Sequence, residues 1–357
     1  MITRVRNWLK NNGYEGVILT RKDNFLWLTK GDENHVLSST DIGVASLLIT
    51  DHEILMFADS SDAQRMRDEQ NSLGAKVIEV PWYESMEEAI KKVVVCKNIV
   101  SDTGMLNTQN VQEHLMELRL SLDAQEVTLY RELGKECAEI VEGVCLEAKP
   151  GQTENHIAYL IKSRCIEKGI SPDCVLVGSD DRIIKYRHPM PTDREVEKSL
   201  MVVLGGQKHG LYISMTRMVC FGSVPKDIAR KYEKCQEIFV GMQLSMKDGL
   251  NSKDYFANVI ALYEKSGYPE EWKNHHQGGS TGYGCREEVI KPDSQSILKK
   301  GQAYAWNPTI AGVKCEETTY LTEKGVEIFT RTDRWPVKKV ETLFGSMEVA
   351  QIWTSMC

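Results

Sequence analysis

The feature that most restricts the fold of this chain is a pair of helices that the sequence predicts twice. The first helix of the first pair runs from about Glu126 to Ala148, with apolar residues on one face. It ends at Lys149-Pro150-Gly151, because proline lacks a backbone donor and glycine accepts a left-handed turn. Gln152-Thr153-Glu154 then caps a second helix.

The same pattern returns about 98 residues later in a looser form. A helix that begins near Lys231 ends at Lys247-Asp248-Gly249-Leu250, and Ser252 is placed to cap another helix over about Asp254–Ser266. A glycine-rich strand region follows each helix pair. The sequence therefore predicts an α+β domain over residues 124–357, built from two halves that are related by an internal pseudo-twofold repeat.

Residues 1–123 alternate helical and strand patterns and predict a separate α/β domain. A helix over Ile2–Asn12 is broken at Gly13, and a buried strand follows over Gly16–Thr20. Further strands are expected at Val44–Thr50, Glu53–Ala58, Lys76–Val80 and Asn98–Ser101, and helices at Ser85–Val94 and Asn107–Leu120. The polar stretch Ser121–Glu126 marks the boundary between the two domains.

The composition excludes several classes of function. A formal net charge of −7 and a pI near 5.7 do not favour nucleic acid or a membrane surface as a partner. No apolar run approaches the roughly 20 residues of a membrane span. The ten cysteines are scattered without a C-x-x-C pair, which indicates reduced thiols and a cytoplasmic location. A small-molecule substrate is the expected partner.

Three segments carry a resemblance to a known family. They are MVVLGGQKHGLYISMTRMV (201–219), HHQGGSTGYGCRE (275–287) and AWNPTIAGVKCEETTYLT (305–322). Their spacing and glycines resemble the pita-bread superfamily of prolidase, aminopeptidase P, methionine aminopeptidase and creatinase. The resemblance covers the whole chain and is specific over residues 126–330. It implies an α/β N-terminal domain, a pita-bread C-terminal domain, hydrolase activity and a homodimer.

In the metallopeptidases of this superfamily, two Asp, one His and two Glu hold a pair of divalent metal ions. The positions that match these ligands here are Val203, Ser214, Gly279, Asn307 and Glu316. Only Glu316 keeps a carboxylate, and hard cations need several oxygen or nitrogen donors at fixed distances. We therefore expect neither a metal ion nor another cofactor. The alternative is a different alignment, in which His209, His275 or His276 still binds metal.

The remaining groups suggest acid–base chemistry. Lys185-Tyr186-Arg187-His188-Pro189 resembles the segment that places a histidine over the active site, and in creatinase, the metal-free amidinohydrolase of the family, that histidine is the general acid/base. The resemblance thus assigns this role to His188 and makes Glu316 its carboxylate partner. Adjacent strand residues face opposite sides, and the match favours Glu316 over Glu317 as the one in the pocket. Creatinase has a second Glu where Thr216 stands here.

Other residues are candidates for substrate binding. Arg286 could pair with a substrate carboxylate, Asn307 could hold an amide or guanidino group, and Gly278-Gly279 would permit close approach to a ligand. For each candidate a structural role is the alternative. The full set is Arg187, Ser214, Thr216, His275, His276, Gln277, Tyr283, Arg286 and Asn307, with Trp27 and His35 reaching in from the neighbouring subunit of the dimer.

Three functions remain open. The leading prediction is a metal-independent, creatinase-like hydrolase that cleaves a C–N bond of a small polar substrate. The first alternative is an Xaa-Pro dipeptidase or aminopeptidase P-like metallopeptidase with an unrecognised metal arrangement. The second is a non-catalytic pita-bread binding protein. Metal content separates the first two, and the effect of His188→Ala on turnover separates the first from the third.

Overall fold

The structure is a computed structural model that describes residues 1–355. Contacts within the chain divide it into two compact units, one over Met1–Leu120 and the other from Ser121 onward. The division falls a few residues before the boundary at 123/124 that the sequence predicts. None of the helices in the described part of the chain is both long enough and apolar enough to cross a membrane.

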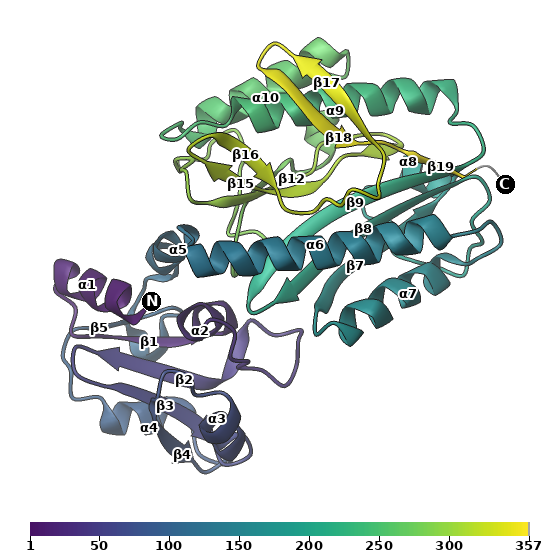
Figure 1. Cartoon of the computed structure of the whole chain (residues 1–357). Coiled ribbons are helices and arrows are strands. Elements are labelled where there is room, and N and C mark those ends of the chain that lie inside the picture. The colour runs from purple at the N-terminus through teal and green to yellow at the C-terminus, as the bar shows by residue number, and fades with distance from the viewer. Residues whose placement is uncertain (356–357) are drawn as a thin grey trace. The chain divides into compact units, whose positions relative to one another are not determined.

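The N-terminal unit is a six-stranded mixed sheet with helices around it (Figure 1). Its strand order is β4-β3-β2-β1-β5-β6, with antiparallel pairing from β1 to β3 and parallel pairing elsewhere. The strands are β1 (Gly16–Arg21), β2 (Ile42–Thr50), β3 (Ile54–Asp59), β4 (Lys76–Val80), β5 (Ile99–Ser101) and β6 (Gln109–Asn110). The helices are α1 (Ile2–Asn12), α2 (Lys22–Thr29), α3 (Ala63–Glu69), α4 (Met86–Val93), the 3₁₀ turn η1 (Met105–Asn107) and α5 (Gln112–Leu120).

Most of the elements expected in this unit are confirmed. Helix α1 has the predicted bounds, and it ends at Gly13 because that residue adopts φ 72°, a left-handed conformation that glycine accepts. Helix α5 is shorter than predicted, since residues 107–111 belong to η1, β6 and a connection. Helices α2 and α3 were not predicted.

The C-terminal unit contains two main sheets. One has the order β19-β9-β8-β7 and the other β11-β10-β12-β15-β16. The strands of the first are β7 (Ser171–Ser179), β8 (Ser199–Lys208), β9 (Leu211–Phe221) and β19 (Trp353–Ser355). Those of the second are β10 (Gly278–Thr281), β11 (Glu288–Val289), β12 (Ala303–Trp306), β15 (Glu317–Thr322) and β16 (Gly325–Ile328). Two short hairpins are β13 (Thr309–Ile310) with β14 (Val313–Lys314), and β17 (Val337–Thr342) with β18 (Gly345–Ala350).

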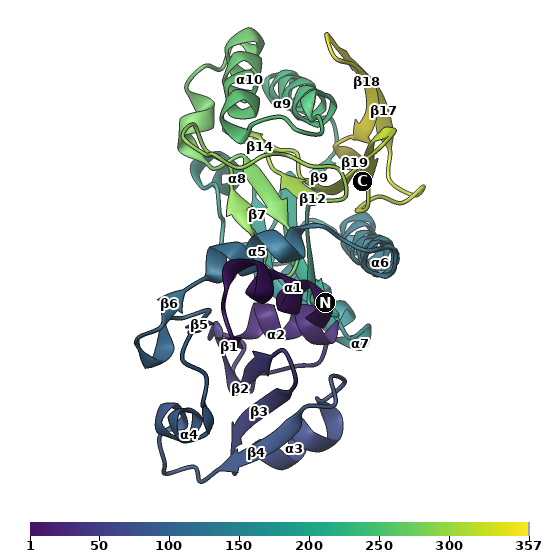
Figure 2. The ribbon, with the colours of Figure 1, turned by 90° about the vertical axis from the view of Figure 1, so that its left-hand side faces the viewer.

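Two helix pairs accompany these sheets, as the repeat predicts. Helices α6 (Ala124–Glu147) and α7 (Glu154–Glu167) pack on β7, β8 and β9. Helices α9 (Lys226–Ser245) and α10 (Ser252–Ser266) pack on each other, and α9 also contacts β12 to β14 and the β17–β18 hairpin. The two pairs lie on different sides of the strands (Figure 2). The remaining helical elements are α8 (Asp181–Lys185) and the 3₁₀ turn η2 (Glu271–Asn274).

The helix ends follow local capping chemistry. Asp123 and Glu126 form a reciprocal capping box at the start of α6, and the Thr153 side chain caps α7 as expected. The prediction that Ser252 caps α10 is wrong. The preceding residue, Asn251, has an extended backbone, and its side chain accepts the hydrogen bond from the Lys253 amide.

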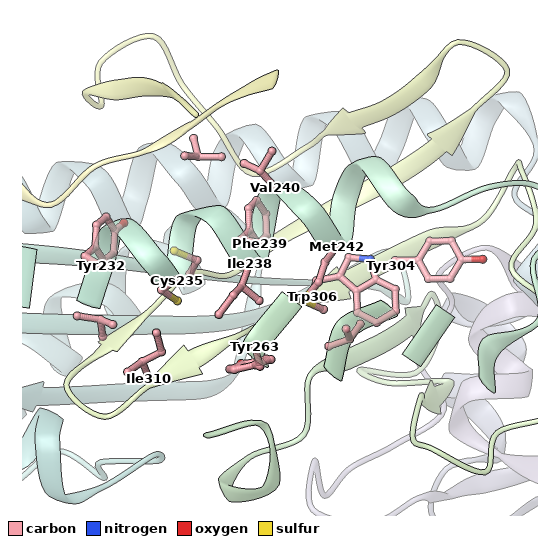
Figure 3. Close-up of a cluster of buried hydrophobic side chains, with 14 of the residues drawn as sticks. Tyr232, Cys235, Ile238, Phe239, Val240, Met242, Tyr263, Tyr304, Trp306 and Ile310 are labelled. Carbon is pink, nitrogen blue, oxygen red and sulfur yellow. The ribbon is translucent and has the colours of Figure 1, made fainter. Parts of the chain in front are cut away.

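An apolar cluster joins α9 and α10 to strands of both sheets of this unit (Figure 3). Tyr304 and Trp306 stack with ring centroids 5.6 Å apart, and Phe239 of α9 belongs to the same cluster. Trp306 is fully buried, which confirms the prediction that it is a core residue. Truncating such a residue costs about 3–5 kcal/mol. Its neighbours Ala305 and Asn307 alternate to the other face of the strand, toward the candidate site.

Candidate functional site

Glu316 lies at the centre of a buried charged cluster. Its carboxylate accepts hydrogen bonds from Thr216 Oγ1 at 2.7 Å and Arg286 NH2 at 3.3 Å, and pairs with Lys314 Nζ at 2.8 Å. The Glu316 and Lys314 side chains are each only 3% exposed. Burial alone would raise the pKa of Glu316, but the charges of Lys314 and Arg286 outweigh it and lower the pKa to about 2. Glu316 is therefore a carboxylate over the physiological pH range.

Lys314 is a member of this cluster that the sequence reasoning missed. It lies on β14, two residues before Glu316. Residues two apart on an extended segment face the same side, so the Gly-Val-Lys-Cys-Glu pattern contained the signal. Its strand partner Thr309 has a buried hydroxyl oxygen with no partner among the described residues.

The cluster is assembled where the two sheets meet. The Thr216 amide donates to the Glu316 carbonyl at 3.1 Å, and the Ser214 amide donates to Thr318 Oγ1 at 2.7 Å. Arg286 reaches Ser214 Oγ at 2.9 Å from the loop between β10 and β11. The predicted residues Ser214, Thr216, Arg286 and Glu316 are thus brought together by strands and loops that are distant in sequence.

Glu317 belongs to a different buried network. It pairs with Arg217 NH1 at 2.8 Å and accepts from Thr330 Oγ1 at 2.7 Å. Arg217 also pairs with Glu142 of α6 at 2.8 Å. Since Glu317 is directed to these groups and Glu316 to Lys314 and Arg286, the two neighbouring carboxylates serve opposite faces of the strand.

The residues present do not fit a two-metal centre. Val203 is part of the apolar core, and Ser214 Oγ is neutral and bonded to Arg286. An added Cβ at Gly279 would lie 1.9 Å from the Glu288 carbonyl oxygen, so no histidine can stand there without moving β11. Two cationic side chains already hold the remaining carboxylate, Glu316. This donor set lacks the oxygen ligands that such ions require.

Gly279 also corrects an expectation. The sequence suggested that Gly278 and Gly279 leave room for a ligand. Instead, the space beside Gly279 holds the β11 backbone, and a Cβ on Gly278 would meet the Ala305 carbonyl oxygen at 2.0 Å. The two glycines permit close approach between strands of the protein itself.

Three histidines form a second cluster in this unit. His188 Nε2 lies 3.0 Å from His275 Nε2, and the His275 and His276 rings stack with centroids 4.4 Å apart. One ligand atom from each ring lies within 4.8 Å of the others. His275 is only 8% exposed, and its Nδ1 has no partner within residues 1–355.

All three imidazoles are held in the neutral form. Burial, followed by the charge of Lys314, lowers the pKa of His275 to about 3. Burial and then Arg286 lower the pKa of His276 to about 4. The pKa of His188 is lowered by burial and by Lys314, while Glu316 opposes this shift. The Lys314–Glu316 pair therefore acts electrostatically on the whole histidine cluster.

The loop that carries His188 is fixed from two sides. Arg187 forms an ion pair with Glu271 of η2, the turn that precedes His275. Pro189 packs so closely on Gly178 of β7 that a Cβ there would lie 2.6 Å from it. Arg187 thereby links the two histidine segments, and its contact with substrate stays a prediction.

The predicted pairing of His188 with Glu316 is not what the structure shows. The His188 ring bonds His275, and the Glu316 carboxylate is bonded to Thr216, Lys314 and Arg286. The physical reason is that Lys314 and Arg286, two permanent cations, occupy the carboxylate oxygens. Glu316 influences His188 through its charge only.

Two further predicted contacts are corrected by burial. The Gln277 side chain is fully buried, accepts from Tyr263 OH at 2.6 Å and donates to the carbonyls of Trp272 and His275. Its amide therefore supports the histidine turn. Tyr283 is 2% exposed and donates to Glu126 Oε1 at 2.8 Å, so its hydroxyl is bonded inside the unit and is not available to a substrate.

Asn307 remains available for a ligand. Its amide N–H donates to the Gln277 carbonyl at 3.1 Å, which fixes the backbone beside the histidine turn. Its side chain is 2% exposed, and Oδ1 has no partner in the described part of the chain. A buried unpaired acceptor is costly, so Asn307 is suited to a donor from a ligand or a water.

The other candidate residues lie elsewhere. Trp27 in α2 is fully buried, so its indole cannot extend into a neighbouring subunit as the resemblance implied. His35, in the same unit, is partly exposed and its role stays a prediction. His209 adopts φ 53° in the turn between β8 and β9 and is not one of the three clustered histidines, which removes it as a replacement ligand for metal.

Comparisons with known proteins agree with this architecture. The model of metallopeptidase family M24 matches residues 128–327. The Xaa-Pro dipeptidase of Pyrococcus horikoshii is 20% identical over 360 residues, covering 93% of this chain and 97% of the relative. A relative of Bacillus subtilis named as a dipeptidase is 22% identical, covering 92% and 97%.

Solved structures confirm the predicted fold. The prolidase of Pyrococcus horikoshii superposes with a TM-score of 0.79 at 17% identity, covering 93% of this chain and 98% of the other. An Xaa-Pro dipeptidase from Bacillus anthracis gives 0.79 at 16% identity, covering 99% of both. The α/β N-terminal domain and the pita-bread domain are thus those expected from the sequence. The family model spans more than half of the chain, and the chain belongs to metallopeptidase family M24.

Proposed function

We propose that this protein is a hydrolase that cleaves a C–N bond in a small substrate carrying a carboxylate, and that it works without the two-metal centre of its relatives. The observation that carries the proposal is that Lys314 and Arg286 pair with Glu316, the one matched position that keeps a carboxylate. Two cations face one carboxylate there, which leaves an excess positive charge for an anionic group of the substrate.

The binding groups are those that the protein leaves incompletely bonded. Arg286 Nε is buried and has no partner among the described residues, and the same holds for Asn307 Oδ1. A guanidinium recognises a carboxylate through paired hydrogen bonds, and an amide oxygen accepts from an N–H group. A substrate with a carboxylate and an amide, amidine or guanidino nitrogen matches both.

The proton transfer is assigned to His188. Its imidazole is neutral because burial and Lys314 lower its pKa, so it can accept a proton from water at neutral pH. His275 Nε2 lies 3.0 Å from His188 Nε2 and orients the ring, so the proton from water goes to Nδ1 of His188. The proton on His188 is then available to the leaving nitrogen, as hydrolysis of a C–N bond requires.

A second candidate is favoured by the comparisons. Relatives that cover almost the whole chain are named Xaa-Pro dipeptidases, and the family is one of metallopeptidases. This function needs a metal-bound hydroxide, and the matched positions lack the ligands that would hold the metal ions. The names of the relatives support a hydrolase, and the donor set supports a different mechanism.

Turnover assays distinguish the two candidates. The protein is tested on Xaa-Pro dipeptides with EDTA or with added Mn²⁺ or Co²⁺, and on a panel of small carboxylates that carry an amide, amidine or guanidino group. We expect hydrolysis of a panel member in EDTA and none of the dipeptides. Dipeptide hydrolysis that requires about two metal ions per chain would refute the proposal.

Variants then test the assigned roles. His188→Ala should abolish turnover while the protein stays folded and still binds substrate. Arg286→Gln should raise the Kd for a carboxylate substrate at least tenfold, since hydrogen bonds to charged groups contribute about 1.5–3 kcal/mol. Arg131→Gln is the matched control, because Arg131 forms an exposed ion pair with Glu327 in the same unit. Binding without any turnover by the wild type would favour a non-catalytic protein.

A further inference from the structure

The histidine cluster has a capacity that the proposed function does not use. His188, His275 and His276 come from two segments that are about 87 residues apart. Each offers a ring nitrogen that lies within 4.8 Å of the other two. None of the three stands at a position that matches a metal ligand of the family. Those positions are Val203, Ser214, Gly279, Asn307 and Glu316.

We propose that His188, His275 and His276 bind a single first-row transition metal ion. Three imidazoles are the ligand set of an open zinc site, in which the fourth position is left to water. Imidazole suits Zn²⁺, Co²⁺, Ni²⁺ and Cu²⁺, in contrast to the carboxylates that hold two ions in the relatives.

The distances between the rings are close to those that a metal requires. With Zn–N bonds of about 2.0–2.1 Å, tetrahedral ligand nitrogens lie roughly 3.3 Å apart. The three nitrogens of the cluster lie within 4.8 Å of one another, and the His188–His275 pair is at 3.0 Å. Small ring movements therefore complete the coordination, and the backbone of the two segments can stay in place.

The two ring nitrogens of His275 have different surroundings. Its Nε2 contacts His188, while its Nδ1 is buried and has no partner among residues 1–355. Coordination of a metal ion through Nε2 would leave the ring proton on Nδ1, where a bound water can accept it.

Arg286 and Lys314 oppose a cation here, and Lys314 is the one that acts on all three histidines. Its ammonium group is paired with Glu316 at 2.8 Å, and both side chains are 3% exposed. This pairing offsets much of the repulsion, and the Glu316 charge also favours a cation near the histidines. The site should select ions that bind imidazole strongly and should not bind Mg²⁺ or Ca²⁺.

The inference goes beyond the proposed function and does not rest on it. Metal binding uses the lone pair of His188, so a bound ion would prevent His188 from accepting a proton from water. Assays for the proposed hydrolysis should therefore contain a chelator.

The test is a titration of the EDTA-dialysed full-length protein with Zn²⁺ by calorimetry and with Co²⁺ by visible absorption. We expect one ion per chain and the intense visible bands of tetrahedral Co²⁺, without a thiolate charge-transfer band. His276→Ala should weaken binding at least tenfold. His156→Ala, which removes an exposed histidine at the start of α7, should bind as the wild type does.

Three results would overturn the inference. They are no stoichiometric binding by the wild type, unchanged binding by a folded His276→Ala protein, or a thiolate band that disappears in Cys285→Ser. Cys285 is the exposed thiol beside Arg286 and is the most accessible competing ligand. Circular dichroism establishes that each variant is folded, and His188→Ala provides a second ligand deletion from the other segment.

Discussion

Replacing Arg217 with methionine should destabilise the C-terminal unit strongly. Arg217 is 1% exposed and donates to Glu142, to Glu317 and to two backbone carbonyls, those of Thr216 and Thr330. Methionine has a similar length and removes the charge, which leaves two buried carboxylates without a cation. Breaking a buried ion pair in this way costs about 3–5 kcal/mol. For a unit of this size the melting temperature should fall by roughly 10 °C.

The cost should depend on pH in a defined direction. Burial raises the pKa of Glu317 to about 7 even with Arg217 present, so without Arg217 this carboxyl would take up a proton in the folded state. A folded-state pKa above the unfolded value gives stability at low pH that is lost as pH rises. The Arg217→Met protein should therefore lose more stability at pH 8 than at pH 6.

Urea unfolding followed by circular dichroism at the two pH values measures both effects. Arg230→Met is the matched control, because Arg230 is 69% exposed and its pair with Asp227 should contribute no more than about 1 kcal/mol. A triple variant that adds Glu142→Gln and Glu317→Gln should recover part of the lost stability. A loss no larger than that of the control, at both pH values, would refute the argument.

Three further predictions address the site. The pKa of His275 is lowered from the ordinary 6.5 to about 3, so His275 contributes stability that is present above pH 6.5 and is lost as the pH falls. In chelator, the free energy of unfolding should therefore decrease by about 2 kcal/mol between pH 7.5 and pH 5. Urea unfolding of His275→Asn should show a smaller decrease. Gly279→Ala should cost about 1–3 kcal/mol or more because of the Glu288 carbonyl, whereas Gly284→Ala, whose closest contact is the end of the Glu287 side chain at 3.2 Å, should cost less. Lys314→Met should raise the pKa of His276, a change that NMR titration of its ring protons would detect, and an unchanged value would contradict the assigned electrostatics.

Local signals explain which parts of the fold could be predicted. Helices α6 and α10 carry an apolar face, and α7 begins at the capping residue Thr153, so the positions of all three followed from sequence. Helix α2 was missed because its residues Asn24–Thr29 are all buried, which erases the polar face that marks a helix. Buried helices and buried strands look alike in a short apolar run.

The site shows the same limit. The opposite directions of Glu316 and Glu317 followed from strand alternation. The same alternation could have predicted that Lys314 faces the same side as Glu316. The contact between His188 and His275, however, depends on how two distant segments pack. The role of Gly279 could not be deduced either, since only the position of the β11 backbone shows that the glycine closes a space.

Charge balance supports an anionic substrate for the cluster around Glu316. The family resemblance of the sequence implies a site of two divalent ions and four carboxylates, which would be neutral. Here Lys314 and Arg286 carry two positive charges and Glu316 one negative charge, so the buried cluster has a net charge of about +1. A buried net charge is unfavourable unless another ion compensates it. One substrate carboxylate would restore neutrality, and a substrate analogue with an amide in place of the carboxylate should therefore bind more weakly.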